Sequence, residues 1–218
     1  MSGTLPVNNI NAVTITSNTP SYVSTTLSGR RQVRQIASQY WQIEADFVPL
    51  SRREAGLISA FISNQGNNFS DWDIYLPDIS SSHGSATVVA AANPGVSSAM
   101  LVASNTAAGA TAVPFDTALD SSLFDALGVA KELGLAAGDF VRFSNHSKVY
   151  QLTSDVEFSA TGGGTLNIFP ALRTAVTTTT IVDWRLVAFR VFNTTPVNEI
   201  THSVNGTSEY TLKLQESL

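Results

Sequence analysis

The chain has 218 residues, which is enough for one large domain or two small ones. Hydrophobic residues make up 43% of it and can fill a core, whereas charged residues make up only 13%, about half the usual share. Many hydroxyl side chains with few charges favour β-structure and surface that other subunits cover. The net charge of −5 argues against nucleic-acid binding by the chain as a whole, and the absence of cysteine excludes disulfides and thiolate chemistry.

The first third of the chain alternates apolar and polar residues, which predicts strands. Strands are expected at 11–16, 32–36, 41–47 and 71–76. The third is the clearest, because its apolar residues, from Trp41 to Phe47, fall on one face and its polar residues on the other. Pro49 ends this strand, since proline cannot donate to the ladder.

A helix is predicted directly after this strand. Ser51 and Glu54 have the spacing of a capping box, in which the serine caps the first turn and the glutamate reaches back. Apolar residues then recur at helical spacing, and Gly66 supplies the stop. We therefore expect a helix at 51–63 whose apolar face packs on the sheet. The side chains expected to be buried together are Trp41, Phe47, Ile58 and Phe61.

The middle of the chain has a different composition. From about residue 80 to 111 it is dominated by small side chains, which predicts thin strands or long loops with little core volume. A short helix is expected within 119–133. The residues expected on its apolar side are Leu123, Leu127 and Ala130.

The remainder of the chain again reads as strands and turns. Strands are expected at 140–143, 149–152, 166–169, 186–192 and 210–214. The triple glycine at 162–164 lies between two of them, so it predicts a hairpin tip rather than a phosphate-binding loop, which would join a strand to a helix. Asn205-Gly206 is a second hairpin signal.

The predicted fold class is mainly β. Long strands at both ends with a different composition between them predict a β-sandwich or barrel domain carrying one packed helix at 51–63. This domain would consist of residues 1–84 and 179–218. It would be interrupted by a second, small β-rich lobe at 85–178.

The titratable residues form no catalytic constellation, so the chain is not expected to be an enzyme or to need a cofactor or metal. The histidines are His83, His146 and His202. They lack metal-ligand spacing, and each is expected to be an exposed turn residue. Asp71 and Asp73 share one face of a strand and offer paired carboxylates. The interpretation favoured is two solvated acids on either side of a buried Trp72.

The chain also lacks targeting signals. No basic start followed by an apolar stretch indicates a secretory signal, and no run of about eighteen apolar residues predicts membrane insertion.

The basic residues are grouped. Five of the twelve lie within 24 positions: Arg30, Arg31, Arg34, Arg52 and Arg53. They are candidates for a subunit interface, where they would meet carboxylates of a neighbour such as the Asp71 and Asp73 edge. They could equally face DNA in a channel through nonspecific phosphate attraction, or form a solvated strand and helix start. The sequence leaves these three readings open.

Three segments resemble tail proteins of long-tailed bacteriophages, and they occur in the same order. Residues 33–66 look like the opening of tail-tip proteins, in which an amphipathic strand ends in a Pro-Leu pair and a capped helix follows. Residues 135–172 resemble a β-module of the same proteins, and 210–216 is similar to the closing strand of distal tail and tail-tube subunits. None of these segments is a catalytic signature.

The resemblance implies a virion structural protein, specifically a distal tail protein. Such proteins form rings, usually hexamers with a β-sandwich or barrel body and an outer second domain, that join the tail tube to the baseplate or tail tip. The implied partners are other copies of the chain, tail tube protein, baseplate hub or tail-tip proteins and tail fibres, with nonspecific contact to DNA in the lumen. The implied location is the virion tail, after synthesis in the host bacterial cytoplasm.

Two alternatives stay open. The chain could be another tail or connector subunit, such as a tail tube protein, a terminator or a head–tail adaptor. It could also be a carbohydrate-binding module, because β-domains with exposed Trp and Tyr often hold sugars. The outer domain in the resembled family is often of carbohydrate-binding or OB type, but no sugar-binding residue carries over to this sequence.

Overall fold

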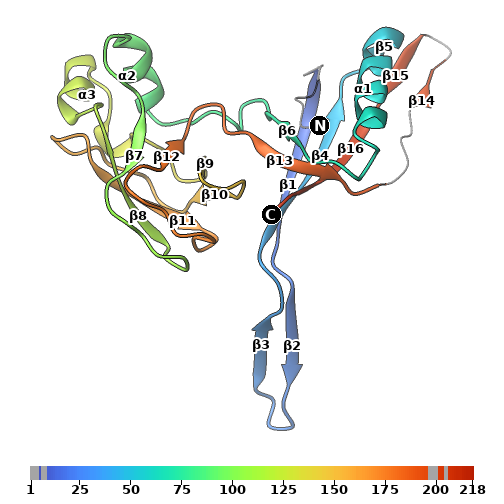
Figure 1. The fold of residues 1–218 in the computed structure, drawn as a ribbon, viewed down its shortest axis with the longest axis horizontal. Coiled ribbons are helices and arrows are strands. Elements are labelled where there is room, and N and C mark those ends of the chain that lie inside the picture. Colours follow the sequence, from blue (N-terminus) through green and yellow to red (C-terminus); the bar gives the residue numbers. More distant parts are fainter. Residues whose placement is uncertain (1–4, 6–8, 196–200, 204–205) are drawn as a thin grey trace. The chain divides into compact units, whose positions relative to one another are not determined.

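The computed structural model describes residue 5 and residues 9–195, 201–203 and 206–218 (Figure 1). The chain forms two compact units. The terminal unit combines Met1–Ile74 with Arg190–Leu218, and the inserted unit is Tyr75–Phe189. Residues 75–84 and 179–189, which the sequence pattern assigned to the terminal domain, belong instead to the inserted unit.

A five-stranded sheet forms the terminal unit, in the order β1-β4-β16-β13-β6. Its strands are β1 Ile10–Asn18, β4 Tyr40–Phe47, β6 Trp72–Ile74, β13 Phe189–Asn193 and β16 Thr211–Glu216. β16 runs antiparallel to β4 with Leu214 opposite Ile43, so buried side chains from distant parts of the chain pack on one face. The expectation that both ends of the chain share one sheet is confirmed, and so is the alternating burial along β4.

The strand predicted at 186–192 begins three residues late. Leu186 has φ +51°, a left-handed conformation that interrupts an extended chain, and its side chain is 69% exposed. β13 therefore starts at Phe189. From there its burial alternates, with Arg190 on the less buried side.

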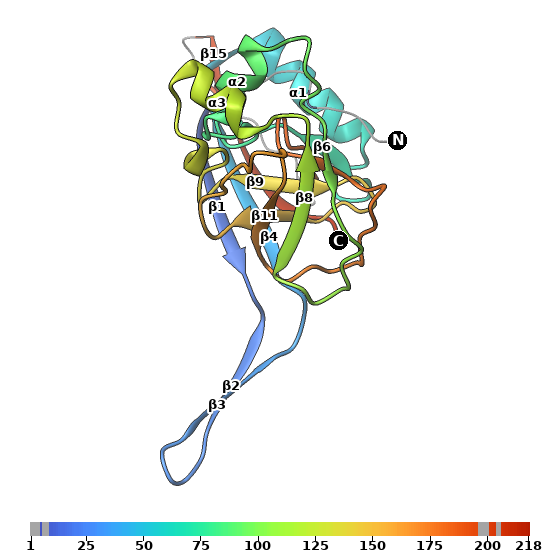
Figure 2. The same ribbon diagram turned by 90° about the vertical axis from the view of Figure 1, so that its left-hand side faces the viewer.

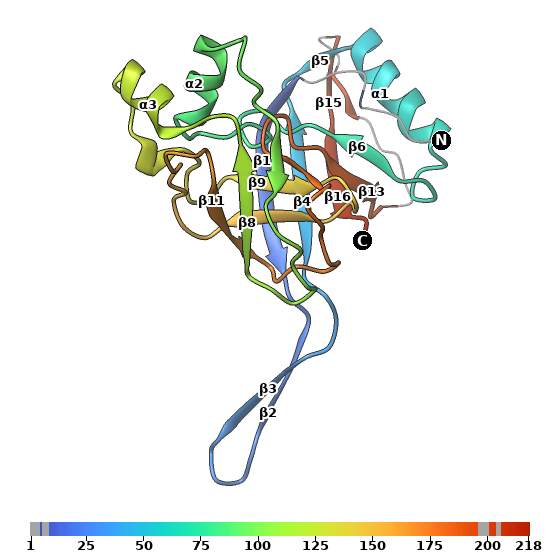
Figure 3. The same ribbon diagram turned by 60° about the vertical axis from the view of Figure 1, so that its left-hand side comes forward.

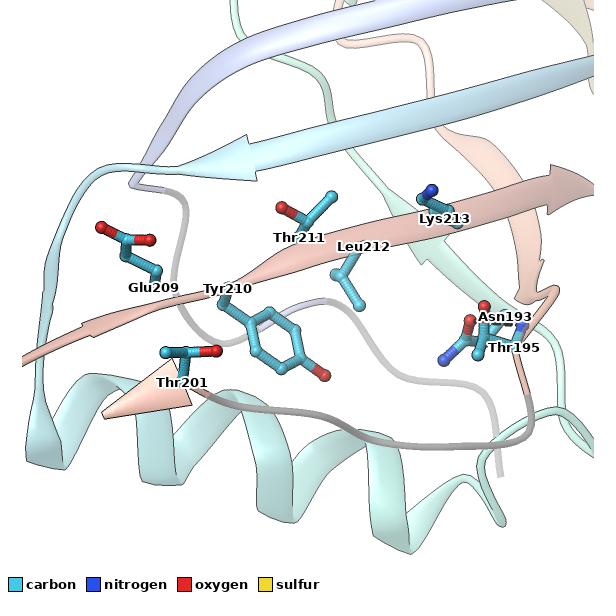
Figure 4. Close-up of a pocket in the computed structure, with 8 residues that line it drawn as sticks. All are labelled: Asn193, Thr195, Thr201, Glu209, Tyr210, Thr211, Leu212 and Lys213. Atoms are coloured by element: carbon cyan, nitrogen blue, oxygen red, sulfur yellow. Dashed lines mark hydrogen bonds between the residues drawn. The ribbon is translucent and has the colours of Figure 1, made fainter. Parts of the chain in front are cut away.

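Helix α1 (Arg52–Asn64) has the predicted capping box. Ser51 Oγ accepts a hydrogen bond from the Glu54 backbone N–H at 3.4 Å, and the Glu54 carboxylate accepts one from the Ser51 backbone N–H at 2.9 Å. These two bonds satisfy donors that a helix start otherwise leaves without partners. Figure 4 shows Tyr210, which directly precedes β16, and Leu212 on β16 pointing toward α1.

The apolar face of α1 is the predicted one, with one difference. Ala55, Ile58 and Ile62 are fully buried. Phe61 is only half-buried, because it lies at the margin of this face and packs edge-on against Trp72, with ring centroids 5.3 Å apart. The expected burial of Trp41 and Phe47 is confirmed.

A small three-stranded sheet follows the order β14-β15-β5. Its strands are β5 Leu50–Ser51, β14 Thr201–His202 and β15 Thr207–Glu209. Gly206, with φ +80°, lies in the turn between β14 and β15, where a hairpin was predicted. Asn205, the other half of that signal, lies outside the described residues.

The inserted unit contains a closed barrel, visible in Figure 3, with strand order β10-β11-β8-β7-β12-β9. Its strands are β7 Met100–Val102, β8 Ala112–Thr117, β9 Phe140–Phe143, β10 Val149–Leu152, β11 Gly164–Phe169 and β12 Ile181–Asp183. β12 pairs with both β7 and β9, so it closes the barrel. This pairing explains why residues after 178 belong to the inserted unit. The predicted fold class, mainly β with a barrel and a packed helix, is confirmed.

Two helices and a 3-10 turn accompany the barrel: α2 Ala86–Ala92, α3 Ser121–Leu127 and η1 Lys131–Leu133. α2 lies where only thin strands or loops were expected. Its alanine-rich sequence favours a helix, and Val89 with two alanines is buried at helical spacing. α3 was predicted, but its buried residue is Phe124, whereas Leu127 is 43% exposed.

The triple glycine lies in the connection between the antiparallel strands β10 and β11, as predicted, and Gly162 has a left-handed φ of +83°, but this connection packs against the barrel. Gly162 is buried, and a Cβ there would overlap the carbonyl oxygen of Thr117. A Cβ on Gly164 would lie 2.7 Å from the ring of Phe115. The glycines therefore allow the chain to pass directly against β8 at the start of β11.

Candidate interaction surface

A hairpin projects from the sheet of the terminal unit (Figures 1 and 2). It consists of β2 Ser21–Thr25 and β3 Arg31–Gln35, which pair only with each other. The chain passes from β1 into β2 and from β3 back into β4, so the hairpin continues the β1–β4 ladder. The Ile36 N–H donates to the Pro20 carbonyl at 2.9 Å at the junction. We call residues 20–38 the hairpin arm.

Local interactions account for the shape of the arm. Val23 lies opposite Val33, and β-branched residues suit a strand. The turn is closed by a hydrogen bond from the Thr26 N–H to the Arg30 carbonyl at 2.9 Å, with Gly29 at φ +78°. Glycine adopts that φ without strain, which explains why the chain can turn at this residue.

The arm buries almost none of its apolar surface. Its exposed apolar side chains are Tyr22 at 62%, Val23 at 47%, Leu27 at 112%, Val33 at 55% and Ile36 at 67%. A two-stranded hairpin is at best marginally stable alone, and clustered exposed apolar residues indicate a surface for a partner. Sequence reasoning missed these residues, because alternation identifies a strand without saying whether anything covers its faces.

The arm is also basic. It contains Arg30, Arg31 and Arg34, and the first acidic residue of the chain is Glu44. The arm contributes +3 to a net charge of −5, so the other residues together carry −8. No carboxylate of the described residues forms an ion pair with these arginines. Arg34 lies opposite Tyr22 on one face of the arm, while the valine pair lies on the other.

The structure does not bring the five grouped arginines together. Arg52 and Arg53 start α1, at the opposite end of β4 from the arm. β4 has 8 residues, which span about 25 Å at the usual rise of a strand. The group in the sequence is therefore two exposed groups in space, and only the first lies with the exposed apolar side chains.

The acids expected to face a neighbour's arginines have partners in their own chain. Asp71 accepts a hydrogen bond from Ser217 Oγ at 2.7 Å, and Asp73 lies 3.7 Å from an Arg190 guanidinium nitrogen. Trp72 between them is fully buried, as the favoured interpretation required. Asp71 and Asp73 are therefore not a free acidic edge.

Of the three histidines expected to be exposed turn residues, His83 is exposed, whereas His146 is not. His146 is half-buried and stacks on Phe143. The Arg173 backbone N–H donates to the Tyr150 hydroxyl, which leaves the hydroxyl proton to donate to His146 Nε2 at 2.7 Å. Burial and then nearby cations lower the pKa of His146 to about 4, so its ring is neutral at physiological pH.

His83 has different surroundings from His146. The His83 ring lies between two aspartates, Asp78 and Asp139, which sequence spacing alone did not reveal. The placement of the His202 side chain lies outside what the structure describes.

A polar hollow of about 410 Å³ lies beside β16 (Figure 4). Its lining residues are Asn193, Thr195, Thr201 and the stretch 209–213. Burial raises the pKa of Tyr210 to about 12, so its hydroxyl stays protonated. This lining offers one amide, several hydroxyls, a lysine and the Glu209 carboxylate.

No protein-family model matches the sequence, and no curated protein matches it significantly. Within the described parts of the chain, no three His, Asp or Glu side chains come together as a metal site. The described helices are all too short or too polar to cross a membrane. The hairpin arm therefore gives the clearest indication of function.

Proposed function

We propose that this chain is a virion structural protein, a distal tail protein that forms a ring joining the tail tube of a long-tailed bacteriophage to its baseplate or tail tip. The observation that carries the proposal is the exposed, apolar and basic hairpin arm. The resemblance of three segments to phage tail proteins supplies the biological setting.

The arm requires a partner that buries it. Leu27 is fully exposed and Ile36 is 67% exposed, and each would gain about 1–2 kcal/mol from burial in an interface. An acidic protein surface would also neutralise the three arginines. The remainder of this same chain carries −8, so a second copy supplies both needs.

An arm that reaches from one copy to the next makes a head-to-tail contact. Head-to-tail contacts close into a ring when the rotation between copies divides a full turn, as in cyclic oligomers. The low charge of the chain suits the formation of such contacts, because Ser, Thr and Asn surfaces lose little on desolvation.

The alternative in which the arginines face DNA explains less of the arm. Nonspecific DNA binding needs only positive charge near phosphates. It gives no role to the exposed Val23, Leu27 and Val33, whose burial requires an apolar protein surface. A protein partner accounts for both the charge and the apolar side chains.

The carbohydrate-binding alternative also gains no support. All three tryptophans are buried: Trp41 at 3%, Trp72 at 0% and Trp184 at 3% exposure. Sugar sites on β-domains commonly use exposed aromatic faces; these indoles present none, and exposed Tyr22 lies on the arm beside Arg34, where a protein partner accounts for it as well. The other tail roles, tail tube, terminator or adaptor, would use the same arm and differ only in their place in the virion.

The test is the assembly state of the purified chain, measured by native mass spectrometry and electron microscopy. We expect closed rings from the intact chain. We expect monomers when 19–39 is replaced by Asn-Gly, a two-residue turn that suits the directly opposed Asn18 and Tyr40. A monomeric intact chain at high concentration would contradict ring formation, and antibody labelling of virions away from the tail tip would contradict the distal position.

A further inference from the structure

The chain enters the inserted unit through residues 75–84, which we call the connecting segment. Its turn is held by a few hydrogen bonds. Ser80 Oγ accepts from the Leu76 N–H at 2.8 Å, and the Ser80 carbonyl accepts from the Val187 N–H at 2.7 Å. Asp78, in this turn, has φ +66° and a side chain that is 89% exposed. Leu76 and Ser80 are buried, at 1% and 3% exposure, so Asp78 is the loosely held residue of this turn.

The strongest additional attachment runs through His83. Its Nδ1 lies 3.2 Å from an Asp139 oxygen, and its Nε2 lies 3.3 Å from an Asp78 oxygen. A neutral imidazole has one N–H, so it can donate to only one of these carboxylates and turns a lone pair toward the other. The imidazolium donates to both. The geometry is that of the charged ring.

The two carboxylates differ in how firmly they are held. The Asp139 side chain is only 2% exposed and accepts hydrogen bonds from the backbone N–H groups of His83 and Ala136, each at 3.0 Å, and from Ser82 Oγ. It is fixed at the start of β9. Asp78 is solvent-exposed, and among the described residues its side chain has only His83 as a polar partner. His83 thus connects a fixed point on the barrel to the loosely held Asp78 side chain of the turn.

We propose that the connecting segment is a pH-dependent latch, in which protonated His83 ties Asp78 to Asp139 and loss of the proton releases the turn at 77–80 from the barrel. The latch sits where the chain joins the two units. Whether the latch is closed or open determines how many residues of the connecting segment are free to move. This inference does not depend on the proposed tail function.

Both facing charges favour the protonated ring. The Asp139 hydrogen bond is the largest cause that raises the pKa of His83, and the charges of Asp139 and Asp78 add to it against the opposing effect of burial. Arg185 is the cation that lines the adjoining hollow together with Ser82. Its guanidinium donates a hydrogen bond to Ser98 Oγ and lies over the Trp184 ring. Because the folded-state pKa is raised, the latch is fully present below the ordinary histidine pKa and is lost as pH rises through the raised value.

The test is amide hydrogen exchange on the full chain at about pH 5.5 and about pH 8, values on either side of a histidine titration. The reporters are the N–H groups of Leu76, Ser80 and Val187, all hydrogen-bonded in the latched state. After correction for the intrinsic rate of exchange, we expect about two- to fivefold faster exchange at the higher pH, as suits an exposed ion pair. Equal protection at both values would overturn the proposal.

Two variants sharpen the test. Asp78→Asn should remove the pH dependence and lower the NMR titration midpoint of His83, and it should fold because asparagine tolerates positive φ. His202→Asn, the matched control, should keep the pH dependence. His146, with a pKa of about 4, does not titrate in this range. Persistence of the effect in Asp78→Asn, or its loss in His202→Asn, would overturn the latch.

Discussion

Arg34 is the residue whose position most changes the interpretation of the sequence. It stands on the hairpin arm beside Tyr22, exposed and without an acidic partner among the described side chains. In the sequence it is grouped with Arg52, but the two lie at opposite ends of β4. An interface role is therefore specific to the arm and does not extend to the helix start.

We expect Arg34→Glu to weaken self-association by about tenfold, because charge reversal at an exposed interface costs on the order of 1–2 kcal/mol. The measurement is sedimentation of the variant across a concentration series. The melting temperature should not change, since Arg34 supports no core contact. The wild-type interaction should also weaken with salt.

Arg52→Glu is the matched control for this experiment. Arg52 is equally exposed, but it starts α1 away from the arm, so its reversal should leave association unchanged. If the two reversals weaken association equally, the arm has no special role. If neither has an effect, the arginines are merely solvated.

At the scale of single elements, the first turn of α1 is stabilised by a cap, whereas its interior contains a destabilising glycine. The capping box at Ser51 stabilises the first turn, whereas Gly56 is exposed inside the helix with nothing within 4 Å of a Cβ placed on it. Glycine costs backbone entropy in a helix interior and has no packing role at this site. Two substitutions of opposite sign follow from this contrast.

We expect Ser51→Ala to lower the free energy of unfolding by about 1 kcal/mol, through loss of the cap. Gly56→Ala should raise it by about 0.5–1 kcal/mol. Both changes are measured by urea unfolding, followed by a spectroscopic signal from the terminal unit. A loss of stability in Gly56→Ala would mean that the exposed face of α1 is in contact with something in the assembled protein or that the helix is distorted there.

At the scale of the whole molecule, the two units have separate cores. The inserted unit closes its own barrel, whose buried residues include Phe115, Tyr150 and Trp184. The points where the chain leaves and re-enters the terminal unit are in neighbouring strands, β6 and β13, of one sheet. Each unit therefore has the structural requirements for folding alone.

We expect residues 75–189 expressed alone to give a cooperative unfolding transition and a dispersed NMR spectrum. The terminal unit should also fold when a short turn joins Ile74 to Arg190, because these residues end and begin adjacent strands. Calorimetry of the intact chain should then show two transitions that match the separate units. A single transition in the intact chain, together with unfolded fragments, would contradict this independence.

The sequence by itself determined those features that depend on neighbours in the chain. The alternation of β4, the capping box of α1 and the strands β9 and β10 were predicted because side-chain periodicity and capping act over a few residues. The mainly β class followed from the same local patterns. The positive charge of the arm was also present in the sequence, as three arginines with no acid before Glu44, but the exposure of its apolar side chains was not.

Tertiary structure decided what covers each face and which distant residues meet. Three-residue β12 has too little pattern to detect, yet it closes the barrel and moves the unit boundary. Gly162 lies in the turn that the sequence predicts, but only the structure shows that a Cβ there would overlap the Thr117 carbonyl oxygen. His83 meets Asp139 across 56 positions, whereas Arg34 and Arg52 are separated because an extended β4 lies between them. Residues close in the sequence are far apart in space when an extended strand lies between them, and residues far apart in the sequence can meet when the chain folds back. Only the packing of the whole chain decides between these outcomes.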